Sequence, residues 1–431
     1  MKKILLTACV LSAGITAFAQ IPEDVLRYSW QPVNGTARIN AIGGAMGSLG
    51  GDISATFTNP AGLAMFKTSD FAISPGYSLL NNKSQFRGTK ATDDGKHFNL
   101  GASGWVGALN GSGNWNNKAV SIAVTRTANF SNSIYYRGQN DFSSYGEQYA
   151  AEAAGSGLSL DDILNSNNVS LGTRMAVYTY LIDTATLGSN PNPDVVSMAM
   201  YNQLANGGAF LLNQAHRIET SGGITEPSIG YAANKNDRWY VGGSIGIPIV
   251  KYDKNTFFRE EDATGDTDND FAFSELSEKF STRGIGINAK LGVINRPNDN
   301  LRMGFAVHTP TWYTMEDTYS ANMWVNLENY RSNPGTESVS STVFTGNTVP
   351  KYKYELVTPW KFMLSGTYIL NSVEDVRQQK GFITADVEYI THKSNRFRNA
   401  EDYDDGGYFD QLNDVMKEYY KNAFNFRLGV N

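Results

Sequence analysis

The feature that most constrains this chain is a repeated alternation of apolar residues with small or polar ones. Between residues 238 and 252, for example, Val241 and Ile245 fall on one face of an extended chain, and Gly242 and Ser244 on the other. A period of two indicates β-strands. Ten segments show it, and most are 11 residues or longer, which suits tilted strands that cross a bilayer. A soluble β-sandwich also alternates, so the pattern alone leaves both folds open.

The links between these segments decide between the two folds, because short and long links alternate along the chain. We predict strands over residues 71–81, 97–109, 118–130, 215–233, 238–252, 280–295, 301–313, 352–370, 381–391 and 423–430. The short links are 110–117, 234–237, 296–300 and 371–380, and the long links are 82–96, 131–214, 253–279, 314–351 and 392–422. An up-and-down barrel places all short turns on the periplasmic side and all long loops outside, whereas a sandwich has no reason to keep this order.

We therefore predict an all-β fold, a transmembrane antiparallel up-and-down β-barrel over residues 69–431. The longest loop, 131–214, is predicted to be partly helical, over residues 148–154, 158–164 and 172–181. Loops of this length usually have structure of their own or a function.

The N-terminus has the three parts of a secretory signal. Lys2 and Lys3 form the charged region, residues 4–16 the apolar region, and Ala17-Phe18-Ala19 the cleavage site. We predict that residues 1–19 are removed, together with Cys9, the only cysteine. The mature chain would then contain no disulfide. No later run approaches the 18 apolar residues of a membrane-spanning helix.

Residues 37–64 fit neither a helix nor a strand, because they are rich in Gly and Ala and end in Asn59-Pro60-Ala61. Glycines such as Gly43 and Gly44 allow backbone to pack closely against backbone. We predict that residues 20–68 form a hatch, a plug that fills the lumen of the barrel.

The hatch motif and the strand pattern resemble the FadL-type long-chain fatty acid transporters of Gram-negative outer membranes, and in particular their haemin receptor-like branch. The resemblance rests on an ordered series of short motifs: Gly43-Gly44-Ala45, Asp52-x-Ser54-Ala55, Asn59-Pro60-Ala61, Thr358-Pro359-Trp360 and Asp386-x-Glu388-Tyr389. It implies a barrel of 14 strands closed by the hatch. It also implies passive uptake of hydrophobic small molecules, which are captured by the loops, gated by the hatch and released sideways at a kinked third strand, here 118–130.

Two alternatives to fatty acid uptake stay open at this point. One is a haemin or aromatic-hydrocarbon transporter on the same scaffold. The other is a surface barrel that transports nothing and whose loops bind a host or matrix partner. The chain also departs from the family, since ten strands are predicted where fourteen are implied. We expect a C-terminally incomplete sequence, in which 423–430 is an edge strand.

The candidate site residues fall into three groups. Those predicted for the hatch and its gating are Gly43, Gly44, Asp52, Asn59, Pro60 and Ala61. Those predicted to bind substrate are Phe57, Tyr178, Leu181, Lys290 and Lys361. Those predicted on the strand of the lateral opening are Thr127, Asn129 and Phe130. Lys290 and Lys361 have the parity of the lumen, where they would either pair with hatch residues such as Arg38 and Asp52 or hold a ligand carboxylate.

The sequence also predicts what the protein is not. The four histidines lie in separate segments and form no catalytic constellation, so we expect no enzyme. The acidic run 266–270 lacks the Gly and Glu of a calcium-binding EF-hand, and we expect no metal and no cofactor. The net charge of −6 argues against nucleic acid. The predicted partners are a hydrophobic ligand, outer-membrane lipids and the barrel assembly machinery, for a monomer in the outer membrane.

Overall fold

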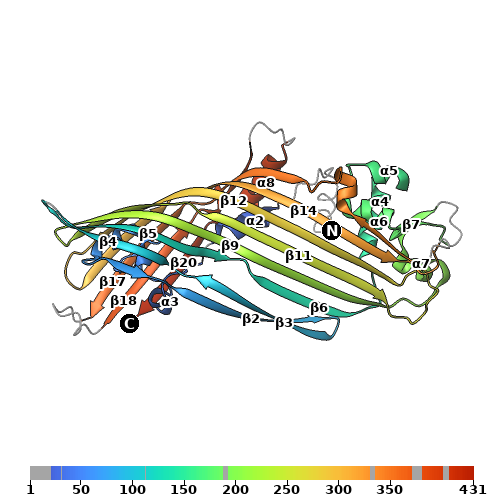
Figure 1. Ribbon diagram of the computed structural model, residues 1–431, viewed down its shortest axis with the longest axis horizontal. Helices are drawn as coiled ribbons and strands as arrows, with labels where there is room; N and C mark the ends of the chain where they lie inside the picture. The colour runs from blue at the N-terminus through green and yellow to red at the C-terminus, as the bar shows by residue number, and fades with distance from the viewer. Residues whose placement is uncertain are drawn as a thin grey trace.

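The computed structural model describes residues 21–30, 32–111, 113–187, 193–330, 335–370, 381–400 and 407–431. The predicted signal peptide and the predicted short link 371–380 lie outside these residues. The described chain forms an elongated, curved antiparallel sheet, with one end near α3 and the other capped by short helices (Figure 1).

Ten strands follow one another across the part of the sheet nearest α3. In sheet order they are β1 (Asp70–Ala72), β4 (Ser103–Asn110), β5 (Trp115–Asn129), β9 (Leu212–Lys235), β10 (Trp239–Gly246), β12 (Phe273–Asn295), β13 (Leu301–His308), β17 (Lys361–Leu370), β18 (Gly381–Ile390) and β20 (Ala423–Val430). Each overlaps one of the ten predicted strands, and every neighbouring pair is antiparallel. Predicted strands 71–81, 97–109, 238–252, 301–313 and 352–370 each run across an interruption and so cover parts of two strands. The predicted all-β, antiparallel fold class is therefore confirmed.

A second set of strands continues the sheet away from α3. It consists of β6 (Asn132–Asn140), β11 (Ile249–Asp262), β14 (Trp312–Asn326), β15 (Thr336–Ser340), β16 (Lys351–Val357) and β19 (Arg396–Asn399). β9 and β12 run through both parts without a break, while the other strands are interrupted at about the same height. Three of the interruptions contain Pro248, Pro310 and Pro359, which have no backbone N–H to donate to the ladder.

Three of the predicted long links are therefore largely strand, and the prediction of loops there is wrong. Residues 82–96 form most of a hairpin between β2 (Pro75–Phe86) and β3 (Thr89–Leu100), with a two-residue turn in which Arg87 and Gly88 have φ of 46° and 88°. β11 pairs with β12 as far as Glu261 opposite Phe273, and β14 reaches Asn326. These extensions face water on their outer side, so the apolar alternation that identifies the other strands is missing there.

The predicted helical loop forms a cap at the end away from α3 (Figure 1). Its elements are α4 (Gly146–Ser156), α5 (Leu160–Asn165), α6 (Leu171–Tyr178), β7 (Ile182–Ala185), β8 (Asp194–Ser197) and α7 (Met198–Asn206). The three predicted helices are found, whereas α7 was not predicted. The cap packs its apolar side chains on the ends of β12 and β14, where Leu276 and Met323 are buried. Two shorter segments, η4 (Ser341–Thr345) and η6 (His392–Ser394), and α8 (Tyr408–Tyr419) complete the links.

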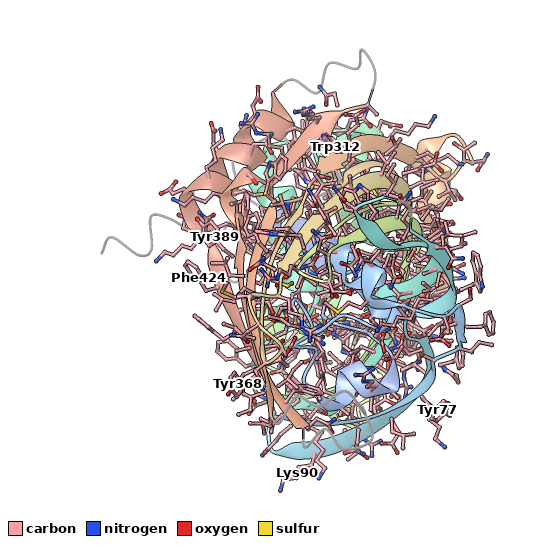
Figure 2. The ribbon with its side chains drawn as sticks, turned by 90° about the vertical axis from the view of Figure 1, so that its left-hand side faces the viewer. Tyr77, Lys90, Trp312, Tyr368, Tyr389 and Phe424 are labelled. Carbon is pink, nitrogen blue, oxygen red and sulfur yellow. The ribbon has the colours of Figure 1, made fainter. Side chains whose placement is uncertain are left out.

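The outer face of the sheet bears a continuous apolar band around its ten-strand part. Ile229, Ile245, Leu291, Leu364 and Phe426 are each more than half exposed, from 57% to 75%. Figure 2 looks at the molecule from the α3 end, and Tyr368, Tyr389 and Phe424 project outward from the sheet there. Soluble proteins rarely expose an apolar surface of this extent, whereas a transmembrane barrel requires one.

The inner face of the sheet surrounds the N-terminal segment, which packs against the wall at two heights. Near one end lie α3 (Ala37–Ala41), η1 (Ile53–Thr56) and η2 (Pro60–Met65), whose apolar side chains pack among small wall residues such as Ala119 and Ala232. Further along the lumen lies α2 (Pro22–Ser29), where Val25 and Tyr28 are fully buried.

The sheet is not closed over the described residues. β1 pairs only with β4, and β20 pairs only with β18. Among the described helices, none is both long enough and apolar enough to cross a membrane.

Candidate functional site

The hatch is held in shape by side-chain caps at each of its turns. Thr36 Oγ1 accepts a hydrogen bond from Ile39 N at the start of α3. Asp52 caps η1 by accepting from Ser54 N at 2.9 Å, and Asn59 caps η2 by accepting from Ala61 N at 3.2 Å. Gly43 and Gly44, with φ of 65° and 75°, form the turn that ends α3. These polar residues replace the regular ladder that the segment lacks.

The wall is built of glycine where the hatch touches it. A Cβ added to Gly242 would lie 2.6 Å from the carbonyl carbon of Pro60, and one added to Gly304 would lie 2.6 Å from Gly47 O. A Cβ added to Gly292 would collide with Asn59 Oδ1. The small residues on the inner face of these strands are therefore required by the close approach of the hatch.

Gly292→Ala should prevent the hatch from seating. The added methyl group overlaps the side chain of Asn59, and overpacking of this kind costs about 1–3 kcal/mol. We expect a lower melting temperature of the detergent-solubilised protein, followed by intrinsic fluorescence. Gly366→Ala is the matched control, because a Cβ at Gly366 meets nothing within 4 Å. An unchanged melting temperature for Gly292→Ala would contradict the close fit.

Polar contacts also join the hatch to the wall. The carboxylate of Asp386, on β18, accepts from the backbone N–H groups of Met46 at 2.9 Å and Gly47 at 3.1 Å. Ser244 Oγ donates to Thr56 O at 2.7 Å, and Arg302 Nη1 donates to Leu49 O at 2.6 Å. Asp52, which the sequence analysis paired with the wall, instead accepts from Thr36 Oγ1 within the hatch, and Arg38 is exposed. Of the two alternatives left open for the lumen charges, pairing with Arg38 or Asp52 is not found within the described residues, and Asp386 and Arg302 bind backbone groups of the hatch instead.

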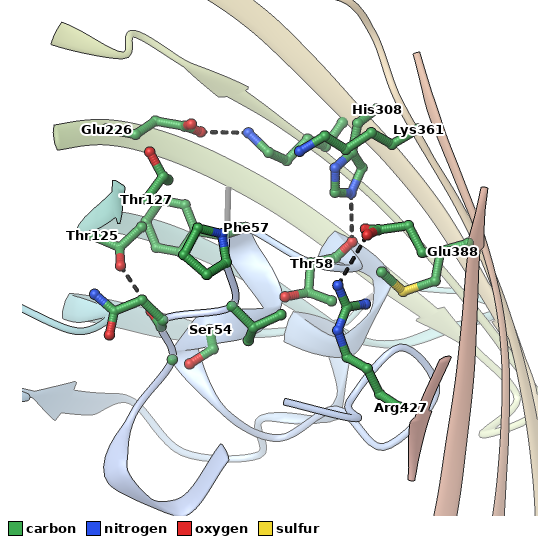
Figure 3. A pocket seen from close by; sticks show the side chains of 16 residues that line it. Ser54, Phe57, Thr58, Thr125, Thr127, Glu226, His308, Lys361, Glu388 and Arg427 are labelled. Atoms are coloured by element: carbon green, nitrogen blue, oxygen red, sulfur yellow. Dashed lines mark hydrogen bonds and ion pairs between the residues drawn. The ribbon is translucent and has the colours of Figure 1, made fainter. Parts of the chain in front are cut away.

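A cavity lies between the hatch and the wall, close to the height at which the strands are interrupted (Figure 3). Residues 32–35, which we call the strap, connect α2 to the hatch and form one side of the cavity. The hatch contributes Ser54, Phe57 and Thr58, and the remaining lining comes from β5, β9, β12, β13, β17, β18 and β20. The volume is about 70 Å³, well below the ~300 Å³ of a small-molecule pocket. The cavity therefore has room for a few waters in this state of the protein.

Charged side chains from several strands converge on the cavity. Lys290 Nζ pairs with Glu226, and Arg427 Nη2 pairs with Glu388 at 2.9 Å. Lys361 also lines the cavity. Three basic groups thus face two carboxylates, which leaves an excess of positive charge for an acidic ligand group.

Further hydrogen bonds organise these groups. Lys290 Nζ donates to Asn288 Oδ1 at 2.8 Å, and Asn425 Nδ2 donates to Glu388 Oε1 at 2.9 Å. His308 Nε2 lies 2.8 Å from Thr58 O, which joins the cavity wall to the hatch (Figure 3).

The wall has a gap beside the cavity. β4 pairs with β5 from Asn110, opposite Asn117, to Ser103, opposite Val124. Beyond this point β3 takes the place of β4, and within the described chain β3 forms no ladder with β5 or β6. The register of β5 with β9 shifts between Arg126 and Ala128, which makes Thr127 a bulge. β5 ends at Asn129, and Phe130 lies in the interruption before β6.

Asn34, in the strap, bridges this gap. Its Nδ2 donates to Leu100 O at 3.0 Å and to Arg126 O at 2.8 Å, on the two sides of the gap. Nδ2 also lies 3.3 Å from Asn99 Oδ1, and Thr125 Oγ1 donates to Asn34 O at 2.9 Å. One residue of the strap thus joins the two sides of the gap beside β5, while Asn82 and Ser84 of β2 donate to Ser133 O and Tyr135 O of β6 further along.

The structure brings together only some of the predicted substrate residues. Phe57, Lys290 and Lys361 all line the cavity. Tyr178 and Leu181 do not, because they belong to the cap at the other end of the sheet, where Leu181 is buried and Tyr178 packs on Phe344. Lys290 is paired with a wall carboxylate rather than with the hatch.

Sequence reasoning missed Glu226, Arg427 and Asn34 as site residues. A signal existed for Glu226, which has the same parity as Ser228 and Gly230 on the inner face of β9. No comparable signal existed for Asn34, because its importance depends on a gap that appears only in the folded wall.

Comparisons with known proteins give few matches. No protein-family model matches the chain, and no curated protein matches it. Among solved structures, the chain is similar to the toluene transporter TodX of P. putida, with a TM-score of 0.41 and 10% identity over 94% of this chain and 80% of that one. It is also similar to a FadL homologue of Pseudomonas aeruginosa, with a TM-score of 0.30 and 9% identity over 93% and 97% of the two chains. At these values the likeness is one of overall chain course, and no function is transferred from it.

Proposed function

We propose that this chain is an outer-membrane β-barrel that admits small hydrophobic molecules by passive, hatch-gated diffusion. The observation that carries the proposal is a plugged lumen enclosed by a wall whose outer face is apolar. The outer face suits lipid, while the inner face holds a charged cavity against the hatch. The signal-like N-terminus and the resemblance of the hatch motif to FadL-type transporters support the same class.

The size of the cavity determines what uptake would require. A ligand does not fit into about 70 Å³, so the strap or the hatch moves when a ligand enters. The gap beside β5 offers a way out into the bilayer, so that a lipid-like solute need not cross water. We propose that the solute arrives from the cap side, pauses in the cavity and leaves through this gap.

The preferred ligand in this proposal is an amphiphile with a carboxylate, of the long-chain fatty acid type. Its head group would meet Lys361 and Lys290, and its chain would lie along Phe57. A second candidate is an aromatic hydrocarbon, because Tyr28, Phe130, Tyr252 and Phe280 form a series of edge-to-face rings further along the lumen. Ring centroids are 5.6 Å apart for Phe130 and Tyr252 and 5.9 Å for Tyr28 and Phe130.

The proposal is tested with proteoliposomes that contain the purified protein. A fluorescent long-chain fatty acid, its neutral alcohol analogue and an aromatic hydrocarbon are offered separately, and their transfer into the bilayer is followed. Faster transfer than into empty liposomes is expected for at least one probe. Equal rates for all three probes with and without protein would reject transport and favour a surface barrel with a binding role.

Lys361→Met should separate the two candidate ligands. A hydrogen bond to a charged group contributes about 1.5–3 kcal/mol, so uptake of the fatty acid should fall roughly tenfold or more. Uptake of the neutral alcohol should change little, since the methionine keeps most of the side-chain volume. Lys279→Met, on the exposed face of β12, is the matched control. A parallel loss for acid and alcohol would show that Lys361 does not select a carboxylate.

A further inference from the structure

The outer face of the sheet changes character abruptly where the apolar band ends. On β11 and β12 the apolar band ends at Ile249 and Ile285, which lie opposite each other. The next outward pair is Lys251 and Arg283, also opposite each other. Trp312 and Trp360, 47% and 39% exposed, lie at the same edge of the band, where interfacial tryptophans are found.

Starting at this edge, three successive rows of outward positions cross the strands between β5 and β19. The register gives the rows as Arg126, Thr225, Ile249, Ile285, Thr314, Glu355 and Arg398; then Asn129, Gly223, Lys251, Arg283, Glu316 and Lys353; then Ser221, Asp253, Ser281, Thr318 and Lys351. Together they hold six basic and three acidic side chains, in a chain whose net charge is −6. We call these three rows the belt.

Part of the belt is neutralised internally, and part is not. Arg283 pairs with Asp253 at 2.7 Å, and Lys351 with Glu316 at 3.0 Å. Lys353 and Arg398 are exposed, and neither forms an ion pair within the described ranges. They sit on the neighbouring strands β16 and β19, in a diagonal relation that places side chains about 7–8 Å apart.

Arg396 adds a third positive charge just below this pair. It lies opposite Val357, in the row of Trp312, at the edge of the apolar band. An exposed arginine at this depth extends its guanidinium toward the head groups. Lys353, Arg396 and Arg398, which we call the β16–β19 cluster, therefore direct their charges to the same level above the band.

We propose that the β16–β19 cluster binds the phosphate of a phosphorylated glycolipid in the outer leaflet. The inference rests on the proposed membrane location but not on transport. A phosphate matches the guanidinium geometry of two arginines and the charge of all three groups. The apolar residues below the cluster would contact the acyl chains of the same lipid, and basic residues at this depth are attracted by anionic head groups.

The test uses the purified, detergent-solubilised full chain and native mass spectrometry. Bis-phosphorylated lipid A is the probe, and dephosphorylated lipid A and inorganic pyrophosphate are the comparison ligands. The triple variant Lys353→Gln, Arg396→Gln, Arg398→Gln should bind lipid A at least about tenfold more weakly than the wild type. The control triple variant Lys83→Gln, Lys90→Gln, Lys279→Gln removes three exposed cations outside the cluster and should bind normally.

Several results would overturn the proposal. Equal binding of dephosphorylated lipid A would show that only acyl chains are recognised, and full competition by pyrophosphate would indicate a site for free phosphate. An equal loss in the control triple variant would indicate general attraction by charge. The triple cluster variant should keep wild-type uptake in proteoliposomes. Lipid binding is measured without transport, so it can be interpreted even if the wild type transports none of the probes.

Discussion

Asp386→Ala should release the hatch from the wall. The carboxylate is buried and accepts the backbone N–H groups of Met46 and Gly47, so its removal leaves two buried donors without an acceptor. Hydrogen bonds to a charged group contribute about 1.5–3 kcal/mol each. A loss of about 3 kcal/mol would raise the population of the displaced hatch roughly a hundredfold.

Cysteine labelling measures this population directly. Ser48 is fully buried between hatch and wall, where it bonds to Ser365 and Thr367. In the variant Ser48→Cys, a maleimide should react slowly with the wild-type hatch and much faster when Asp386→Ala is added. The predicted removal of Cys9 with the signal peptide leaves no competing thiol.

Ile383→Ala is the control for Asp386→Ala, because Ile383 lies on the same strand and is 42% exposed on the outer face, away from the hatch. It should leave the labelling rate of the hatch cysteine unchanged. If Asp386→Ala labels no faster than Ile383→Ala, the carboxylate is not what anchors the hatch.

Asn34→Ala should open the wall beside the cavity. The substitution removes the amide that donates to Leu100 O and Arg126 O across the gap. No ladder in the described chain replaces these bonds, so lipid should reach the cavity. A bimane label at Thr127→Cys, on the cavity lining, should then be quenched several-fold more strongly by brominated lipid.

Closing the gap with a cross-link is the complementary test of the exit route. The side chains of Asn34 and Asn99 approach to 3.3 Å, so the pair Asn34→Cys, Asn99→Cys can be cross-linked across the gap. Oxidation should stop probe transfer to the bilayer, and a reductant should restore it. Asn234→Ala, which removes hydrogen bonds to Asp237 in the short turn between β9 and β10, away from the strap, is the control for Asn34→Ala. Unhindered transfer through the oxidised pair would place the exit elsewhere.

The parts of the fold that could be predicted are those in contact with lipid. A strand that faces a bilayer must alternate, and Val241, Ile245 and Leu291 are outward while Ser244 and Lys290 are inward, as the sequence indicates. Beyond the bilayer the same strands face water on their outer side. Asp253, Lys279 and Glu316 therefore replace apolar residues there, and the strands are mistaken for loops.

The site was only partly predictable, because the alternation along a strand tells which face a side chain is on but not which residue it pairs with. Lys290 and Lys361 could be assigned to the lumen from alternation alone. The pairing of Lys290 with Glu226, 64 residues earlier, depends on the register of β9, β10 and β12, which no local pattern determines. Tyr178 and Leu181 were assigned to the ligand from their apolar character, whereas Leu181 belongs to the core of the cap and Tyr178, 44% exposed, packs on Phe344.

The position of α2 has a consequence for biogenesis. Val25 and Tyr28 are enclosed by Leu356 of β16, Phe397 of β19 and Met416 of α8, and Tyr420 Oη donates to Pro22 O at 2.5 Å. A helix near the start of the described chain is thus surrounded by segments that are synthesised much later. Insertion must therefore proceed around a segment that is already present, and an assembly factor that guides these strands would have to retain the N-terminus until they wrap it.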